Sequence, residues 1–261
     1  MILNRAPVFF IGHGSPLNAI EDNAFTRALK NLKSIYPKPK AILCISAHWM
    51  TEGTWVTHMA NPKTIHDFYG FPEELFSILY PAPGCPELAE QIAEKILPNI
   101  AHLDDEMWGF DHGTWSVLKH IFPNADIPVI QLSLHLEQPP QYHFELGKKL
   151  SSLRDEGVLI IGSGNVVHNL SLLKWEHGPK AYEWAIQFDE WIKENLTLRN
   201  YESIVHDFLD KESGRLSVPT LEHYLPLLYI LGACDKNDKL RFEFEGIQNG
   251  SISMRTISLG G

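Results

Sequence analysis

The chain has 261 residues, of which 44% are hydrophobic and 21% are charged, and its formal net charge is −10 at pH 7. This composition is typical of a globular protein and excludes a disordered or fibrous one. The acidic charge argues against a nucleic-acid partner, whose phosphates require a basic face. The sequence contains no run of eighteen apolar residues and no signal-peptide pattern, so we expect no membrane association. Three scattered cysteines favour a reducing, cytoplasmic location.

Three apolar segments predict buried strands in the centre of a sheet. They are Val8–Ile11, residues 41–49 and Val158–Ile161, and the histidines at their carboxyl ends are His13, His48 and His168. Ligands bind beyond the carboxyl ends of parallel strands in open α/β sheets. Each histidine taken singly is more typical of a structural role than of a metal ligand. The three imidazoles would converge only if these strands lie side by side.

The remaining pattern predicts helices and strands in alternation. We expect helices over residues 22–36, 72–79, 86–97, 114–121, 139–156, 181–196 and 220–231, and further strands over 54–59, 127–132, 240–245 and 251–258. Thr220 is a candidate N-cap that places His223 in the first turn of the last helix. The fold class is therefore α/β, with residues 1–261 forming a single domain. Its central mixed β-sheet is flanked by helices and carries a metal site at the strand carboxyl ends.

Two loop segments have unusual compositions. Residues 61–72 contain His66, Asp67, Phe68 and Tyr69, which suit either a pocket lining or a packed surface loop. Residues 104–115 combine acidic, aromatic and glycine residues around His112. That histidine suits either a structural hydrogen bond or an acid/base role at the mouth of a site.

Several common sites are absent from the sequence. Residues 162–165 (GSGN) lack the third glycine of a dinucleotide fingerprint, and no P-loop, H-E-x-x-H or G-x-S-x-G motif occurs. Dispersed histidines favour a site for zinc, iron, copper or nickel over calcium or magnesium. Zinc would polarise a substrate or activate water, whereas ferrous iron would also activate dioxygen.

Seven segments, in this order, resemble the 4,5-DOPA extradiol dioxygenase family. They are GHGSP (12–16), SAHW (46–49), TIHDFYGFP (64–72), YPAPG (80–84), WGFDHGTW (108–115), GSGNVVHNL (162–170) and PTLEHYLPLLYILGA (219–233). The likeness runs from about residue 7 to residue 258. This family belongs to the class III extradiol ring-cleavage dioxygenases, and the resemblance implies the fold of the protocatechuate 4,5-dioxygenase catalytic subunit.

The resemblance also implies the residues of the site. It makes His13, His48, His168 and His223 ligands of one divalent metal ion, with His168 also serving as acid/base and His112 as the second catalytic residue. The wider class uses two histidines and one carboxylate, so Glu222 is an alternative to His223. Neighbouring residues on a helix diverge by about 100°, so only one of the two would face the site. Fe(II) is the ion expected for oxygen chemistry, and an all-histidine set would also hold Zn(II).

The implied reaction is extradiol cleavage of a catechol by O2 to a muconic semialdehyde. With L-DOPA the product would be 4,5-seco-DOPA, which cyclises to betalamic acid. Two other functions fit the same residues: a zinc-dependent, non-redox hydrolase-like enzyme and a metal-dependent protein that binds a small molecule. The sequence does not determine the oligomeric state.

Overall fold

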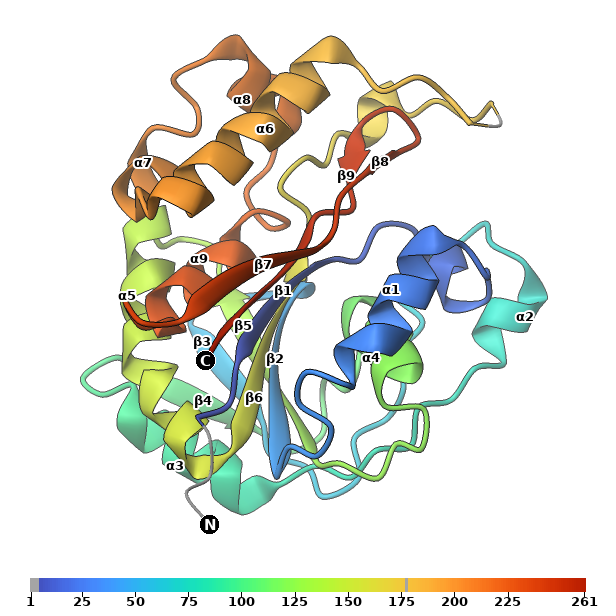
Figure 1. Ribbon diagram of the computed structural model, residues 1–261. Coiled ribbons are helices and arrows are strands. Elements are labelled where there is room, and N and C mark those ends of the chain that lie inside the picture. Colours follow the sequence, from blue (N-terminus) through green and yellow to red (C-terminus); the bar gives the residue numbers. More distant parts are fainter. Residues whose placement is uncertain (1–4, 177) are drawn as a thin grey trace.

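The computed structural model describes residues 5–176 and 178–261, and within them an eight-stranded mixed sheet runs through the centre (Figure 1). The order of its strands is β4-β3-β5-β2-β6-β1-β10-β7. Their bounds are β1 Val8–Gly12, β2 Ala41–Thr51, β3 Thr54–Thr57, β4 Ala101–Asp104, β5 Val129–His135, β6 Val158–Gly164, β7 Lys239–Phe244 and β10 Thr256–Gly260. A separate antiparallel pair joins β8 (Ile247–Gln248) to β9 (Ile252–Ser253). The predicted mixed α/β sheet is therefore confirmed.

Four neighbouring strands, β5, β2, β6 and β1, run parallel and form the core of the sheet. The ladder between β2 and β6 ends at the pair Ser46 and Ser163, and that between β1 and β6 ends at Gly12 and Gly164. The three predicted strands thus lie side by side, as convergence of their histidines requires. Their carboxyl ends share one edge of the sheet.

Successive side chains of the parallel strands pack on opposite faces, as the two-residue period of a strand dictates. The helices are α1 Ala24–Leu32, α2 Glu73–Phe76, α3 Pro86–Lys95, α4 His112–Ile121, α5 Pro140–Leu150, α6 Glu183–Leu198, α7 Tyr201–His206, α8 Glu212–Ser217 and α9 Leu225–Ala233, and the 3-10 turns are Pro16–Ala19, Ser151–Glu156 and Leu170–Leu172. Phe10 and Leu43 belong to one core, with α3, α5, α6, α7 and α9, whereas Phe9 and Ile42 belong to the other, with α1 and α4. Helices therefore cover both faces (Figure 1).

Two strand ends differ from the prediction. Strand β2 continues to Thr51, and its register against β5 shifts between Ile45 and Met50. His48 consequently lies inside an irregular part of the strand, although its ladder with β6 has already ended at Ser46. Strand β6 ends at Gly164, so His168 follows it after a short loop. Both histidines still lie at the carboxyl edge of the parallel core.

The last predicted helix begins later than expected. Helix α9 starts at Leu225, and the residues from Leu221 to Tyr224 form a turn before it. Pro226 explains the difference, because proline has no N–H to donate and is tolerated only in the first turn of a helix. Thr220 therefore does not cap the helix. Glu222 and His223 precede α9, so the helical divergence expected to separate their side chains does not apply.

Other boundaries differ in smaller ways. Asn23, not Asp22, caps α1, and it forms a capping box with Thr26. The helix expected over 72–79 is a single turn, α2, and the strand expected over 251–258 is divided into β9 and β10. Strand β4 and helices α7 and α8 were not predicted, because these segments are short and their apolar residues follow no clear period.

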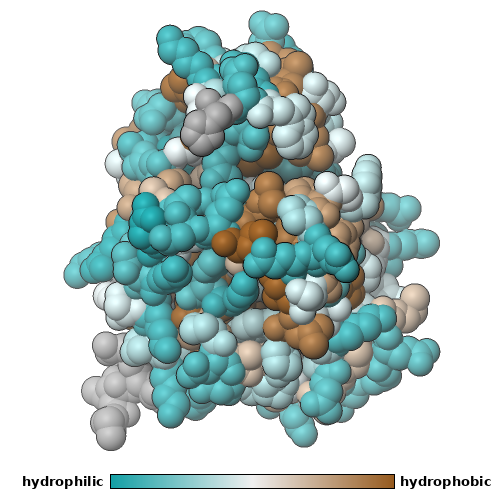
Figure 2. Space-filling model, turned by 90° about the vertical axis from the view of Figure 1, so that its right-hand side faces the viewer, coloured by the Kyte–Doolittle hydropathy of each residue, from teal (hydrophilic) through white to brown (hydrophobic). Residues whose placement is uncertain are grey.

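The side of the molecule that carries α1 and α2 has apolar surface gathered in its middle with hydrophilic surface around it (Figure 2). Exposed apolar residues of α2 and the loop after it include Phe76 and Leu79. Across the residues that the structure describes, every helix is too short or too polar to cross a bilayer.

Gly164 joins the end of β6 to the segments on either side of it. Its carbonyl oxygen accepts the N–H of His13, and the N–H of Asn165 donates to the carbonyl oxygen of His223. A Cβ at position 164 would overlap that same His223 oxygen. The backbone of the turn before α9 can thus approach β6 only because residue 164 has no side chain.

We expect Gly164→Ala to push the turn before α9 away from β6. Overpacking of this kind costs about 1–3 kcal/mol of the free energy of unfolding, which urea denaturation would measure. Amide hydrogen exchange should accelerate at Asn165, whose bond to His223 is broken. The amide of Ile160, in the middle of β6, is the internal control and should keep its protection. Unchanged exchange at Asn165 would contradict the prediction.

Candidate metal centre

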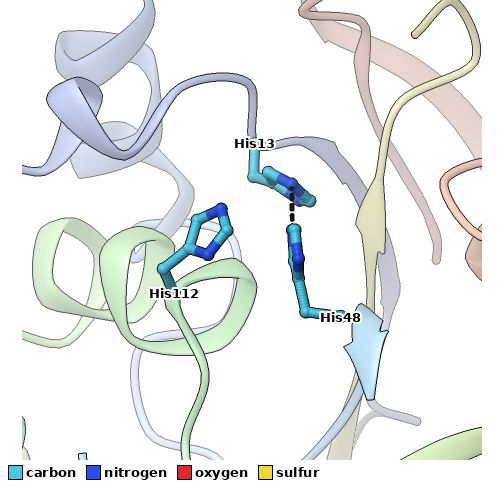
Figure 3. Close-up of side chains that lie close together, drawn as sticks. All are labelled: His13, His48 and His112. Atoms are coloured by element: carbon cyan, nitrogen blue, oxygen red, sulfur yellow. Dashed lines mark hydrogen bonds between the residues drawn. The ribbon is translucent and has the colours of Figure 1, made fainter. Parts of the chain in front are cut away.

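Five histidine side chains of the described residues gather beyond the carboxyl edge of the parallel core. His13 directly follows β1, His48 comes from β2, and His112 is the first residue of α4 (Figure 3). His168 lies in the loop after β6, and His223 lies in the turn before α9. The structure therefore brings together every histidine that the resemblance implied.

His13, His48 and His223 form a nearly equilateral triangle. Their ring centroids are 5.0 Å apart for His13 and His48, 5.4 Å for His13 and His223, and 5.1 Å for His48 and His223. Imidazoles that bind one tetrahedral ion through nitrogens about 2.0–2.1 Å from it have centroids about 5 Å apart. The spacing of this triangle is thus that of a three-histidine metal site.

The other two rings lie against members of the triangle. The His112 ring is 3.9 Å from the His48 ring, and the His168 ring stacks on the His223 ring at 3.4 Å with only 10° between the planes. An ion in the plane of the His223 ring would lie well out of the plane of the His168 ring, whereas imidazole lone pairs lie in the ring plane. Two stacked rings therefore bind one ion poorly together.

The hydrogen bond of the His13 ring defines its tautomer. Ser163 Oγ donates to the carbonyl oxygen of Gly113 at 2.6 Å, so it can only accept from His13 Nδ1, 2.9 Å away. His13 consequently carries its proton on Nδ1 and presents a bare Nε2. This Nε2 lies 3.1 Å from the Nε2 of His48 (Figure 3).

Asp67 lies beside both His48 and His112. Its Oδ2 accepts the N–H of His112 Nδ1 at 2.9 Å and lies 3.3 Å from His48 Nδ1 as a charge contact. Burial works against ionisation of Asp67, but the hydrogen bonds of His112 and the charges of His112 and His48 outweigh it and lower the pKa of Asp67 to about 2. His48 Nε2 donates to the bare Nε2 of His13, because the hydrogen bond between these two atoms needs one proton.

A carboxylate also lies against Nδ1 of His223, the third member of the triangle. His223 Nδ1 lies 3.1 Å from Glu222 Oε1, which also accepts from Thr220 Oγ1 at 2.7 Å. The Nε2 of His223 is buried and has no hydrogen-bond partner among the described residues. An unpartnered buried nitrogen is costly unless a ligand or ion satisfies it.

Burial is the main reason that the pKa values of His13, His48 and His223 lie well below the ordinary histidine value, and neighbouring imidazoles lower them further. Burial also lowers the pKa of His168 to about 4. All four rings are thus neutral at pH 7, which is the form that binds metals.

The residues fit a bound divalent cation. The Nε2 atoms of His13 and His48 face each other at 3.1 Å, and the Nε2 of His223, whose ring centroid lies 5.4 and 5.1 Å from theirs, lacks a hydrogen-bond partner among the described residues. A histidine whose other nitrogen donates to a carboxylate or hydroxyl is the usual arrangement around protein-bound metals. Nitrogen atoms of His13, His48 and His112 lie within 4.8 Å of one another, as do ligand atoms of His168, Glu222 and His223.

A buried carboxylate supports the start of α4. Asp111 caps this helix and accepts hydrogen bonds from Ser46 Oγ at 2.7 Å and Gln131 Nε2 at 2.5 Å, as well as from Thr114 and Trp108. Burial and the nearby charge of Asp67 raise the pKa of Asp111, and these hydrogen bonds oppose the rise. Asp111 thereby links α4, β2 and β5 beneath His112.

The loop over residues 61–72 contributes to the site in part. Asp67 reaches His48 and His112, and the Phe68 ring contacts the His112 ring edge-on at 5.6 Å. Tyr69 points away, with 92% of its surface exposed.

The contributions of Ser163 and Asp111 were not recognised from the sequence, where the signal for Ser163 was a polar residue at the end of an apolar strand. Asp67 was named there only as part of a loop that suits either a pocket lining or a packed surface.

Comparison with known proteins places the chain in a family. Residues 8–254 match the family described as the catalytic LigB subunit of aromatic ring-opening dioxygenase. An Escherichia coli K12 protein named 4,5-DOPA dioxygenase extradiol is 49% identical over 262 residues, covering 100% of this chain and 97% of the relative. A Portulaca grandiflora protein of the same name is 37% identical over 253 residues, covering 94% and 92%.

A crystal structure of an uncharacterized protein from Escherichia coli K12 has the same fold. Its TM-score is 0.87 at 46% identity, covering 98% of this chain and 100% of that one. The family match extends over most of the chain and includes the segments that carry the five clustered histidines. The chain therefore belongs to the LigB family of aromatic ring-opening dioxygenases.

Proposed function

We propose that this chain holds one divalent metal ion through the Nε2 atoms of His13, His48 and His223 and cleaves a catechol ring beside its hydroxyl groups with O2. The observation that supports the proposal is that the Nε2 atoms of His13 and His48 face each other at 3.1 Å, while the His223 ring, whose Nε2 has no hydrogen-bond partner among the described residues, has its centroid 5.4 and 5.1 Å from theirs. Residues 1–261 act as one catalytic domain in this proposal.

Fe(II) is the ion we propose for the reaction, and Zn(II) is a second occupant of the same site. When bound, ferrous iron supplies a redox-active centre at which a catechol and dioxygen can be held together. Three neutral imidazoles place no negative charge on the ion, so the site discriminates little between the two metals.

His168 and His112 serve as the acid/base groups, and the ring geometry separates them from the ligands. His168 stacks on His223, so we assign it to proton transfer and not to the set of ligands. The resemblance implied both roles, metal ligand and acid/base group, for this residue. Its low pKa makes it a neutral proton acceptor. His112 donates from Nδ1 to Asp67 at 2.9 Å, which leaves its Nε2 to accept a catechol proton.

Asp67 would then stabilise the His112 imidazolium that forms, as a carboxylate does for a catalytic histidine in hydrolytic triads. The Phe68 ring beside His112 limits access of water.

The proposed substrate is L-DOPA or a related catechol, because relatives of this chain are named 4,5-DOPA dioxygenase extradiol. Its product would be 4,5-seco-DOPA, which cyclises to betalamic acid. The proposed partners are this small molecule and O2. A cytoplasmic location stays a prediction from the cysteine content.

Oxygen uptake tests the function. Protein stripped of metal and reloaded anaerobically with Fe(II) or Zn(II) would receive L-DOPA or simple catechols while uptake and a yellow product are followed. We expect uptake and the yellow product with Fe(II) only. Hydrolytic activity with zinc and without oxygen would favour a non-redox hydrolase. A catechol bound by the iron-loaded protein but recovered intact would favour a binding protein.

The ligand assignment predicts loss of metal. His13→Ala and His48→Ala should each weaken zinc affinity by more than about 100-fold, because even groups that only orient a ligand are worth about 10–100-fold. Competition with a chelator would measure the affinity. His206→Ala, at an exposed histidine of α7, is the matched control and should bind zinc like the unaltered protein. A ligand variant that retains full affinity would refute the assignment.

The acid/base assignment predicts loss of rate with metal retained. His112→Ala and His168→Ala should each keep their metal and turn over catechol about 10²–10⁴-fold more slowly, because proton transfer contributes that much. Metal content and the rate constant would be measured on the same samples. If His168→Ala loses the metal, His168 is a ligand and not only an acid/base group.

A further inference from the structure

Two consecutive residues at the end of β6 hold His13. The backbone N–H of His13 donates to the carbonyl oxygen of Gly164 at 3.1 Å, and the ring Nδ1 lies 2.9 Å from Ser163 Oγ. Ser163 and His13 are both buried, so bulk water does not compete for these bonds. His13 is therefore anchored at two points, and only one of them depends on a side chain of β6.

The Ser163 hydroxyl has a second partner, which fixes the direction of its own proton. Its Oγ lies 2.6 Å from the carbonyl oxygen of Gly113, a group that can only accept. The single hydroxyl proton is thus used for Gly113, and Ser163 offers only lone pairs to His13. The Nδ1 of His13 must donate, and its Nε2 is left as an acceptor.

The same hydroxyl joins β6 to the start of α4. Gly113 follows His112, the first residue of that helix. A Cβ at position 113 would lie 2.5 Å from Ser46 Oγ and 3.0 Å from His48 Cδ2, so the helix can approach the strand ends only because residue 113 is glycine. Ser163 thereby connects the ring of a proposed ligand with the segment that carries a proposed acid/base group.

We propose that Ser163 is a positioning residue that keeps the proton of His13 on Nδ1 and so reserves Nε2 for the metal ion. The inference rests on the proposed function, in which His13 is a ligand. It also gives a role to the segment GSGN (162–165), which lacks the third glycine of a nucleotide-binding loop. Its serine and its second glycine hold the first histidine of the site.

Ser163→Ala removes the acceptor of the ring and leaves the backbone bond between His13 and Gly164 in place. A buried Nδ1–H without a partner is costly, whereas a proton on Nε2 can be donated to His48 Nε2, 3.1 Å away. His48 would accept it by carrying its own proton on Nδ1, beside the Asp67 carboxylate. We therefore expect the His13 proton to move to Nε2, the nitrogen that would face the metal ion.

Nitrogen-15 NMR of the imidazoles, on metal-free protein, reads the His13 tautomer directly. The unaltered protein should carry the proton on Nδ1, and Ser163→Ala should carry it on Nε2. A proton on Nε2 in the unaltered protein would overturn the inference, and so would an unchanged tautomer in the variant.

Zinc affinity, measured by chelator competition, is the second readout. We expect it to fall about 10–100-fold in Ser163→Ala, as for other groups that orient a metal ligand. The matched control is Ser133→Ala, at a buried serine of β5 whose Oγ accepts the N–H of Trp55 at 2.8 Å and lies 2.7 Å from Thr51 Oγ1. This control should also lower the temperature of thermal unfolding, but it should bind zinc like the unaltered protein.

A purely structural role for Ser163 gives a different result. The two alanine variants would then lose thermal stability and zinc affinity to the same extent, and the His13 tautomer would not change. Neither readout involves a catechol or O2. Unaltered protein that binds zinc but, when loaded with iron, leaves catechols intact would therefore overturn the proposed function alone.

Discussion

His13 and His48 hold their Nε2 atoms together at 3.1 Å, where one hydrogen bond joins the two buried rings. His48 supplies the proton of this bond, because His13 Nδ1 donates to Ser163 and leaves His13 Nε2 as the acceptor. In the proposed function a cation bound between the two nitrogens would replace this proton, so metal binding would release it from His48 Nε2.

The oxygens that lie against the three rings of the triangle come from distant parts of the chain. Ser163 belongs to β6, Asp67 to a loop, and Glu222 to the turn before α9. Gly164 allows the close contact between β6 and that turn. The site is thus distributed over the fold, and its geometry is sensitive to contacts beyond the histidines themselves.

The five rings also show how one cluster can provide two kinds of group. Rings about 5 Å apart can share an ion, whereas rings that stack more closely cannot both direct a lone pair at it. His112 and His168 each lie against a different member of the triangle. In the proposed mechanism, proton-transfer groups are thereby held beside a bound substrate without entering the coordination sphere.

Much of this protein could be predicted from local patterns. The apolar runs predicted the parallel strands, and the histidines that follow them predicted the site, because strand period and burial are properties of short segments. The motif order predicted the family. The tertiary structure decided how the five histidine rings lie against one another, since this depends on ring orientation across strands that are far apart in sequence. It also decided that Asp67, in a loop of ambiguous composition, contacts two histidines at once, because hydrogen-bond partners across the fold leave no mark in a local pattern.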